Sequence, residues 1–458
     1  EEIDKERGVV IEEWRLGRGA QARIRDKQFP VLFQDSRYAE RLPIGTLEIL
    51  ENAPHEAFRR FYREWYRPDL MAVIAVGDFD PEVIETKIQK HFGPLQAPDI
   101  VRPRALYPVP DHEETLVSVV TDPEATGTRV TVGFKRPATH TRTIGDVRDS
   151  LVDSLYDAMM MARLGELARE ADPPFQFGFA SSGSLGRTKS IYQLSAAVRN
   201  GGVERGLRTL LTEARRVEEH GFTESELERI KADVLRSIDV QYEERDKRES
   251  GRIASSFVAS FLQDEPVASV ALRRDLARAL VPGITLDEVN ARAEQWITDD
   301  NRVFLVSGPE SEDAPLPDEA RLLALFDEVR QLAVTPWVDE VRDEPLVPSP
   351  PAPGRIVEEV HHADVHGTRW VLSNGATVLL KPTDFQNDEI LLRAISRGGT
   401  SLVADDDLLS AEMAIGLAGA MGSGEFSATE LRKKLAGKAA NARVFVSPLA
   451  EGASGRSS

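Results

Sequence analysis

The sequence predicts an α/β (α+β) protein whose domains each hold an antiparallel-dominated sheet with helices packed on one side. Apolar runs of strand length, such as residues 71–76 and 302–309, are interspersed with helical patterns of apolar spacing. Capping signals mark the starts of several helices. Two proline-rich stretches, residues 96–114 and 335–359, read as linkers. They give predicted domains at residues 1–95, 115–334 and 360–458.

The first predicted domain opens with an amphipathic helix over residues 1–17, with an apolar stripe of Ile3, Val9, Val10 and Trp14. Residues 46–66 predict helices interrupted near Pro54. The continuous apolar run "MAVIAV", residues 71–76, is typical of a buried strand. The turn "GDFDP" follows, and it places Asp80 as a cap and Pro81 at the first position of a helix that ends at Gly93.

The second predicted domain mixes strands with long helices. Strands are expected at residues 115–122, 128–135 and 302–309, with two more around a glycine turn within 177–199. Helices are expected at 144–170, at 203–220 with Gly221 closing it, at 223–249 from a Thr223–Glu226 capping box, and from Thr285. In the third predicted domain, Asn374-Gly375 between apolar runs indicates a hairpin.

Composition excludes several classes of function. The 458 residues carry a net charge of −19 and no basic tract, which argues against nucleic-acid binding. There is no cysteine, so disulfides, thiolate metal sites and cysteine nucleophiles are absent. Any metal must bind His, Asp or Glu. No apolar run approaches the length of a membrane span, and neither G-x-G-x-x-G nor a phosphate-binding G-x-x-x-x-G-K-[ST] loop occurs.

Two glutamates of the first helix are the candidate site. Glu6 and Glu13 stand seven residues apart, close to two helical turns, so their carboxylates share a face. Such a pair can ligate or tune a metal. A solvated charged helix explains the same pattern when the helix is taken alone.

The order of several segments resembles the pitrilysin/insulinase family of zinc metallopeptidases. These are "DKERGVVIEEW" with Glu6, Arg7 and Glu13, then "RLPIG", then "FYREWYRPDLMAVIAVGDFDP" with its Tyr66-Arg67-Pro68 and Val76-Gly77-Asp78 steps. Residues 368–401 resemble the opening of a second, similar half. The resemblance therefore implies repeated domains in a two-half, clam-shell architecture.

The resemblance also implies a mechanism and a cofactor. In this family two histidines of an H-x-x-E-H motif hold Zn²⁺, the intervening glutamate is the general base, and a downstream glutamate completes the ligand set. Matched residue by residue, Glu13 would be that third ligand and Glu6 the nearby acidic residue that orients or tunes the site. The implied function is zinc-dependent endopeptidase action on peptides or small unfolded proteins, with the extended substrate adding to a sheet edge near the zinc.

The sequence departs from the family pattern at the motif itself. None of its eight histidines stands in H-x-x-E-H. We expect the motif ahead of Glu1, in a longer protein of which this chain is a fragment, inactive alone. The corresponding stretch of the second half, "DDDLLSAEMAIGLAGAMGSG", has no histidine and is expected to be degenerate. A non-catalytic homologue, acting as a peptide-binding or scaffold subunit, is the alternative.

Other features of the sequence are weaker evidence of function. His361, His362 and His366 in "VHHADVH" could bind a metal if helical, but a linker or strand is expected there. Met159 to Arg163, "MMMAR", reads as core or interface packing. The acidic, cysteine-free composition suits a bacterial periplasmic peptidase, with the cytoplasm left open. A homo-oligomer or a partner half also stays open.

Overall fold

The computed structural model describes residues 2–98 and 101–458. Its internal contacts divide the chain into two compact units. Unit 1 is Glu1–Leu227, Ser250–Val267 and Leu280–Val338; unit 2 is Glu228–Glu249, Ala268–Ala279 and Asp339–Ser458. The mixed α/β class is confirmed, whereas the division into three domains stays a prediction.

Unit 1 is built on a five-stranded sheet in the order β1-β5-β2-β4-β3. Its strands are β1 (Leu116–Asp122), β2 (Thr128–Pro137), β3 (Phe177–Ser184), β4 (Lys189–Val198) and β5 (Arg302–Pro309). Only the β1–β5 pair is parallel, so the predicted antiparallel dominance is confirmed. Alternate residues of the central strands, such as Val130, Val132 and Phe134, are fully buried because one sheet face carries the core.

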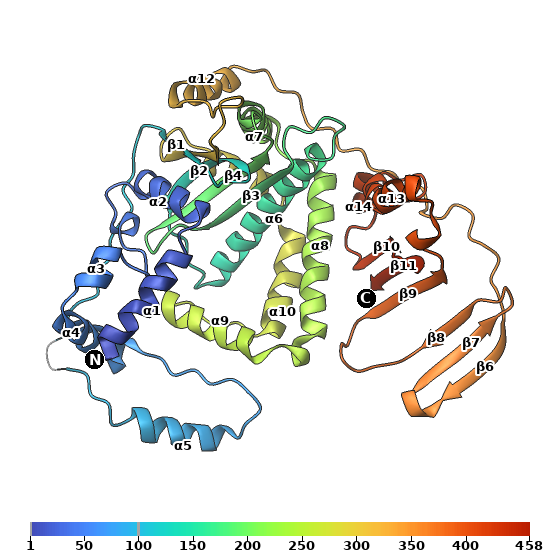
Figure 1. Ribbon diagram of the computed structural model, residues 1–458, viewed down its shortest axis with the longest axis horizontal. Coiled ribbons are helices and arrows are strands. Elements are labelled where there is room, and N and C mark those ends of the chain that lie inside the picture. The colour runs from blue at the N-terminus through green and yellow to red at the C-terminus, as the bar shows by residue number, and fades with distance from the viewer. Residues whose placement is uncertain (1, 99–100) are drawn as a thin grey trace. The chain divides into compact units, whose positions relative to one another are not determined.

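Helices cover that core face. They are α6 (Ile144–Leu167), α7 (Val203–His220), α11 (Leu286–Trp296) and α12 (Glu319–Arg330). Edge-to-face and tilted ring contacts join Tyr156 of α6 and Trp296 of α11 to Tyr192 of β4. Figure 1 shows α7 and α12 side by side at this part of the sheet. The long helices are therefore fixed by an aromatic core.

The opposite sheet face is partly covered by one more helix. Leu32 and Phe33, at the end of α2 (Ala20–Phe33), are buried against Val303 of β5 and Val109 of the predicted linker. The buried Lys135 of β2 donates to the carbonyl of Leu32 at 2.9 Å. Helices thus lie mainly, but not entirely, on one side of the sheet.

The N-terminal segment of unit 1 is helical. It contains α1 (Glu2–Leu16), α2, α3 (Leu47–Asn52), α4 (His55–Trp65) and α5 (Pro81–Phe92). The predicted helix break at Pro54, the Asp80 cap and Pro81 at the helix start are all confirmed. In Figure 1, α5 stands off at the end of extended stretches.

The predicted buried strand at residues 71–76 is wrong. The segment has no regular secondary structure, and Met71 and Val73 are 39% and 43% exposed. A strand forms only when a neighbouring strand takes up its N–H and C=O groups. Within the described residues no strand lies beside this segment, so its apolar run stays uncovered.

The remaining helices of the middle region are α8 (Glu224–Glu243), α9 (Ser250–Gln263) and α10 (Val270–Leu280). Thr223 accepts from the backbone N–H of Glu226 at 3.3 Å, and Glu226 accepts from that of Thr223, so the predicted capping box forms. The box at Thr285 and the Gly221 terminus of α7 are also confirmed.

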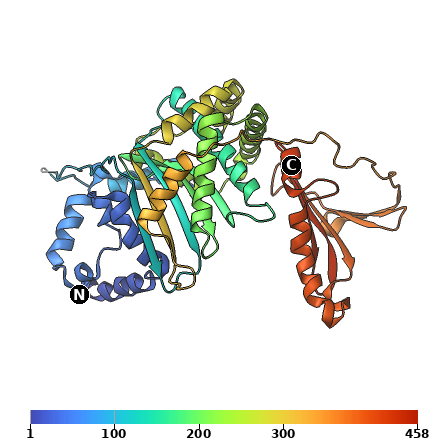
Figure 2. The ribbon, with the colours of Figure 1, turned by 90° about the horizontal axis from the view of Figure 1, so that it is seen from above.

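Unit 2 holds two small antiparallel sheets. One is the meander β6 (Ile356–His362), β7 (Gly367–Leu372) and β8 (Thr377–Leu380), whose last turn is the predicted Asn374-Gly375 hairpin. The other, in the order β10-β11-β9, consists of β9 (Ile390–Arg397), β10 (Ala440–Val446) and β11 (Ala450–Ser457). Figure 2 shows α13 (Leu408–Met421) lying along the second sheet, and α14 (Ala428–Lys434) precedes β10.

Candidate functional site

Glu6 and Glu13 lie on α1, and both side chains are exposed. Neither forms a hydrogen bond or ion pair within the described residues, although neighbouring charged residues of the same helix do. Glu12, for example, binds Arg15. The two predicted site carboxylates are therefore open to a ligand from outside this part of the chain.

The inward face of α1 differs from the predicted stripe. Ile3, Val10, Ile11 and Trp14 are half-buried, whereas Val9 is 59% exposed. The stripe prediction was wrong for Val9 because that residue follows Glu6 by three and precedes Glu13 by four, which puts it on the outward face. Exposed Leu16 continues the same row. The outward face thus alternates carboxylates and aliphatic side chains in the order Glu6, Val9, Glu13, Leu16.

A polar contact that the sequence did not predict holds the first half of α1. The Arg7 guanidinium donates to the backbone carbonyls of Leu50 and Ala53, at the end of α3. Its centre lies 5.2 Å from the centroid of the Phe58 ring of α4, and the side chain is only 16% exposed. Beside it, His55 Nε2 lies 2.6 Å from Asp4 Oδ1, and this hydrogen bond lowers the pKa of Asp4.

A second contact holds the other end of the helix. The Arg18 guanidinium lies 5.0 Å from the centroid of the Trp14 ring and pairs with Asp26 of α2. Arg23 of α2 donates to both oxygens of Asp122 at the end of β1, at 2.7 Å each. These bonds lower the pKa of Asp122 to about 2. They connect α1 through α2 to the five-stranded sheet.

The described residues do not form a complete metal site. No group of three or more His, Cys, Asp or Glu side chains within residues 2–98 and 101–458 could hold an ion. His362 ends β6 and His366 has a left-handed backbone, so the two do not share a helix, as expected. Glu13 has the right chemistry for one zinc ligand, an oxygen donor without a competing partner.

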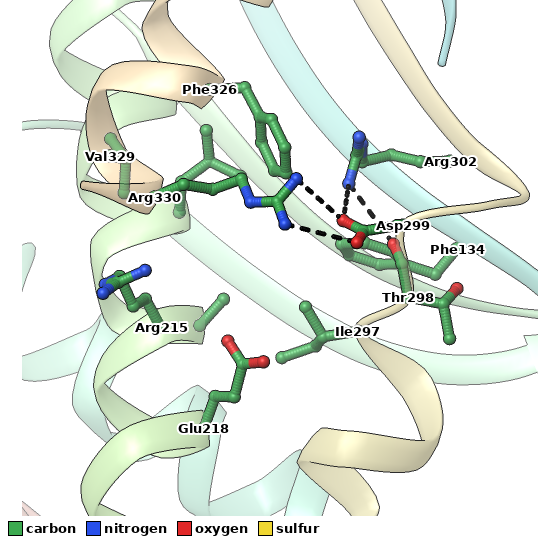
Figure 3. A pocket seen from close by; sticks show the side chains of 12 residues that line it. Phe134, Arg215, Glu218, Ile297, Thr298, Asp299, Arg302, Phe326, Val329 and Arg330 are labelled. Carbon is green, nitrogen blue, oxygen red and sulfur yellow. Dashed lines mark hydrogen bonds and ion pairs between the residues drawn. The ribbon is translucent and has the colours of Figure 1, made fainter. Parts of the chain in front are cut away.

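Unit 1 also contains a separate pocket of about 200 Å³. It is lined by residues of β2, α7 and α12, of the segment before β5 and of the start of β5, and by none of α1 (Figure 3). Asp299 is neutralised there by Arg330 and Arg302, at 3.1 and 3.7 Å. Partial burial raises the pKa of Glu218, which points toward the pocket. This pocket shares no residue with the candidate site.

Comparison with known proteins gives one family match. Residues 52–234 match the family model described as "Peptidase M16 inactive domain". The chain is 31% identical over 438 residues to "Zinc protease PQQL-like" of Arabidopsis thaliana, covering 95% of this chain and 43% of that protein. It is 24% identical to "Probable zinc protease PqqL" of Escherichia coli, covering 94% of this chain and 46% of that one. The chain therefore spans about half the length of these curated relatives.

Solved structures match in fold. The periplasmic protease PqqL of Escherichia coli matches with a TM-score of 0.70 and 22% identity, covering 100% of this chain and 50% of that chain. A structure described as the first half of the same protease matches with a TM-score of 0.68 and 22% identity, over 74% of this chain and 72% of that one. Pitrilysin matches with a TM-score of 0.57 and 13% identity, over 99% of this chain and 48% of the other.

Proposed function

Because this chain belongs to the insulinase and pitrilysin family of peptidases, we propose that it contributes Glu13 to the zinc site of an endopeptidase. In this proposal Glu13 is the third protein ligand and Glu6 supports it. The remaining ligands and the general base come from a part of the protein outside this chain, since no H-x-x-E-H motif occurs in it. The chain alone does not hydrolyse peptides.

One observation carries this assignment. Glu6 and Glu13 have no hydrogen-bond or ion-pair partner in the described part of the chain, and they lie on the outward face of a helix whose inward face is fixed at two points. Exposed Val9 and Leu16 lie in the same row, and their burial on contact with another segment would be favourable. The pattern suits a face that receives a second helix carrying the other ligands.

Each residue of this face then has a distinct task. Glu13 offers a carboxylate oxygen, and Glu6, two turns away, tunes the charge around the ligands. Val9 and Leu16 exclude water from the contact between α1 and the helix that carries the other ligands. A zinc ion held by Glu13 and two ligands from outside this chain would keep one open position, and the chemistry it would supply there is the activation of water for attack on a peptide carbonyl.

The proposed substrates are peptides or small unfolded proteins. The five-stranded sheet of unit 1 is poorly suited to adding a substrate strand. At its β3 edge, the backbone N–H groups of Ala180 and Ser182 donate to Met161 Sδ and Asp157 Oδ2 of α6, at 3.0 and 2.8 Å. At the β1 edge, α2 packs on one face of the sheet, and Arg23 of α2 binds Asp122 at the end of the strand. We therefore place strand addition in another sheet of the complete protein.

We propose a periplasmic location, because the protease PqqL that matches in fold is described as periplasmic. Among the described residues no helix is long and apolar enough to cross a membrane. The second candidate function is a non-catalytic homologue, and the match of residues 52–234 to a domain named inactive favours it. The two proposals differ in whether the complete protein binds zinc.

Zinc stoichiometry of the complete protein tests the proposal. We expect about one zinc per wild-type chain by elemental analysis, and loss of tight binding in Glu13→Gln, which keeps the size of the side chain but weakens the donor. Glu6→Gln should lower peptidase activity more than zinc content. Glu12→Gln is the matched control, because Glu12 adjoins Glu13 but points elsewhere and pairs with Arg15.

The outcomes separate the candidates. Wild-type protein without zinc would favour the non-catalytic homologue. Full zinc content and activity in Glu13→Gln would remove the site assignment while leaving the peptidase proposal. Equal losses in Glu12→Gln and Glu13→Gln would show a general effect of charge on α1 and not ligation.

A further inference from the structure

We infer that Arg7 is a positioning residue for the zinc site, acting through the helix that carries Glu13; this inference rests on the proposed function. Arg7 touches neither glutamate. It fixes α1 against the turn between α3 and α4, and so sets where the outward face of α1 stands.

The partners of Arg7 explain why arginine suits this position. The last carbonyls of a helix have no partner within the helix. The carbonyl of Leu50, in the last turn of α3, and that of the C-cap residue Ala53 are two such groups, and the negative end of the helix dipole lies there. One guanidinium donates to both, because its N–H groups form a rigid fork. The single ammonium of a lysine lacks this fixed geometry.

Arg7 also joins three helices at one point. Its backbone belongs to α1, its hydrogen bonds reach α3, and its guanidinium lies 5.2 Å from the centre of the Phe58 ring of α4. No residue of α1 is fully buried, so apolar packing alone holds this helix weakly. The polar contact at Arg7 is therefore the main anchor of its first two turns.

The position of Arg7 along the helix makes the anchor relevant to Glu13. Glu13 lies between Arg7 and the second anchor at Trp14 and Arg18. A helix held at two points cannot rotate or tilt freely between them. When the Arg7 contact is lost, the first half of α1 keeps the exposed contact between Asp4 and His55, which is a weak restraint, and α1 can pivot about its second anchor. The Glu13 carboxylate is then spread over many positions. Metal affinity falls when a ligand must be ordered on binding.

The test compares Arg7→Gln, Arg7→Lys and the control Arg15→Gln in the complete protein. Arg15 is on the same helix but is 59% exposed and pairs only locally, with Glu12. Zinc affinity is measured by competition with a chromophoric chelator. We expect about tenfold weaker binding in Arg7→Gln, the low end of the range for residues that orient metal ligands without touching the metal. Arg7→Lys should be intermediate and Arg15→Gln unchanged.

A second readout needs no metal. In the zinc-free protein, backbone amides of α1 should exchange hydrogen faster in Arg7→Gln than in wild type, while those of β2 and β4 stay protected. If Arg7→Gln does not fold, the zinc affinity and the amide hydrogen exchange of Arg7→Lys test the inference in its place. Wild-type zinc affinity together with wild-type exchange in the Arg7 variant would overturn the positioning role and leave the proposed function intact. Absence of zinc from the wild-type protein would overturn both.

Discussion

Breaking the buried ion pair between Arg163 of α6 and Glu226 of α8 should strongly destabilise unit 1. Its side chains are 1% and 5% exposed. Arg163 Nε and Nη2 donate to the two carboxylate oxygens at 2.7 and 2.9 Å, and Nη2 also reaches the Gly221 carbonyl at 3.1 Å. The guanidinium also lies 4.7 and 5.1 Å from the ring centroids of Phe222 and Trp337.

We predict that Glu226→Gln lowers the free energy of unfolding by about 3 to 5 kcal/mol, the usual cost of leaving one charge of a buried pair uncompensated. Glutamine keeps the volume and one acceptor oxygen, so cavity formation contributes little. The loss should be measured by urea unfolding followed by circular dichroism. Hydrogen exchange of the backbone amides of α6 and α8 then shows whether the loss of stability lies in these two helices.

Two further variants sharpen this prediction. Asp172→Asn is the control, because Asp172 is 81% exposed and its partner Arg205 is 51% exposed, so the loss of this surface pair should cost at most about 1 kcal/mol. The double variant Arg163→Met with Glu226→Leu should be more stable than Glu226→Gln, since no buried charge is left unpaired. If Glu226→Gln and Asp172→Asn unfold at the same urea concentration, the reasoning from burial is refuted.

Three other predictions concern unit 1. Asp122→Asn should lower the melting temperature at pH 6. Because Arg23 holds the pKa of Asp122 at about 2 in the folded state against 3.8 ordinarily, the difference from wild type should shrink as the pH falls from about 4 toward 2. A difference in melting temperature that persists at pH 2 would contradict this. Thr285→Ala should cost about 1 kcal/mol in urea unfolding by removing the capping box of α11, and no loss would show that the cap contributes nothing. In this chain the amides of residues 71–76 should exchange quickly while those of β2 are protected, and slow exchange would reveal a partner strand.

Local signals of the sequence predicted most of the elements. Thr223, Thr285 and Pro81 mark helix starts because their side chains or rings suit the first turn of a helix, whatever the rest of the fold. The Asn374-Gly375 turn is equally local. Such local signals do not determine which strands pair with each other. The parallel pairing of Val117 with Phe304 joins distant parts of the chain, and nothing in either stretch specifies it.

The candidate site was likewise predicted only in part, because its residue spacing can be read from the sequence and its contacts cannot. The seven-residue spacing placed Glu6 and Glu13 on one face, but the spacing does not say which face is outward. Val9 was misplaced because an aliphatic residue was assumed to point inward. Arg7 was noted only as part of the family pattern, and its anchoring contacts were missed because its partners are backbone carbonyls, which every residue carries and no side-chain pattern reveals. Its place on the inward face, four residues after Ile3 and seven before Trp14, was the available signal.

These differences bear on how a zinc site could be completed. The helix that carries Glu13 is held by contacts within residues 2–65 and through α2 to the sheet, so it needs no further segment to reach its place. Residues 71–76, by contrast, have uncovered side chains and no paired strand within the described chain. A segment that docks against α1 would therefore meet a carboxylate already positioned, and a strand that pairs with residues 71–76 would cover their apolar side chains. Burial of apolar surface would then supply much of the binding energy, and Glu13 would add affinity for the metal without a large ordering cost.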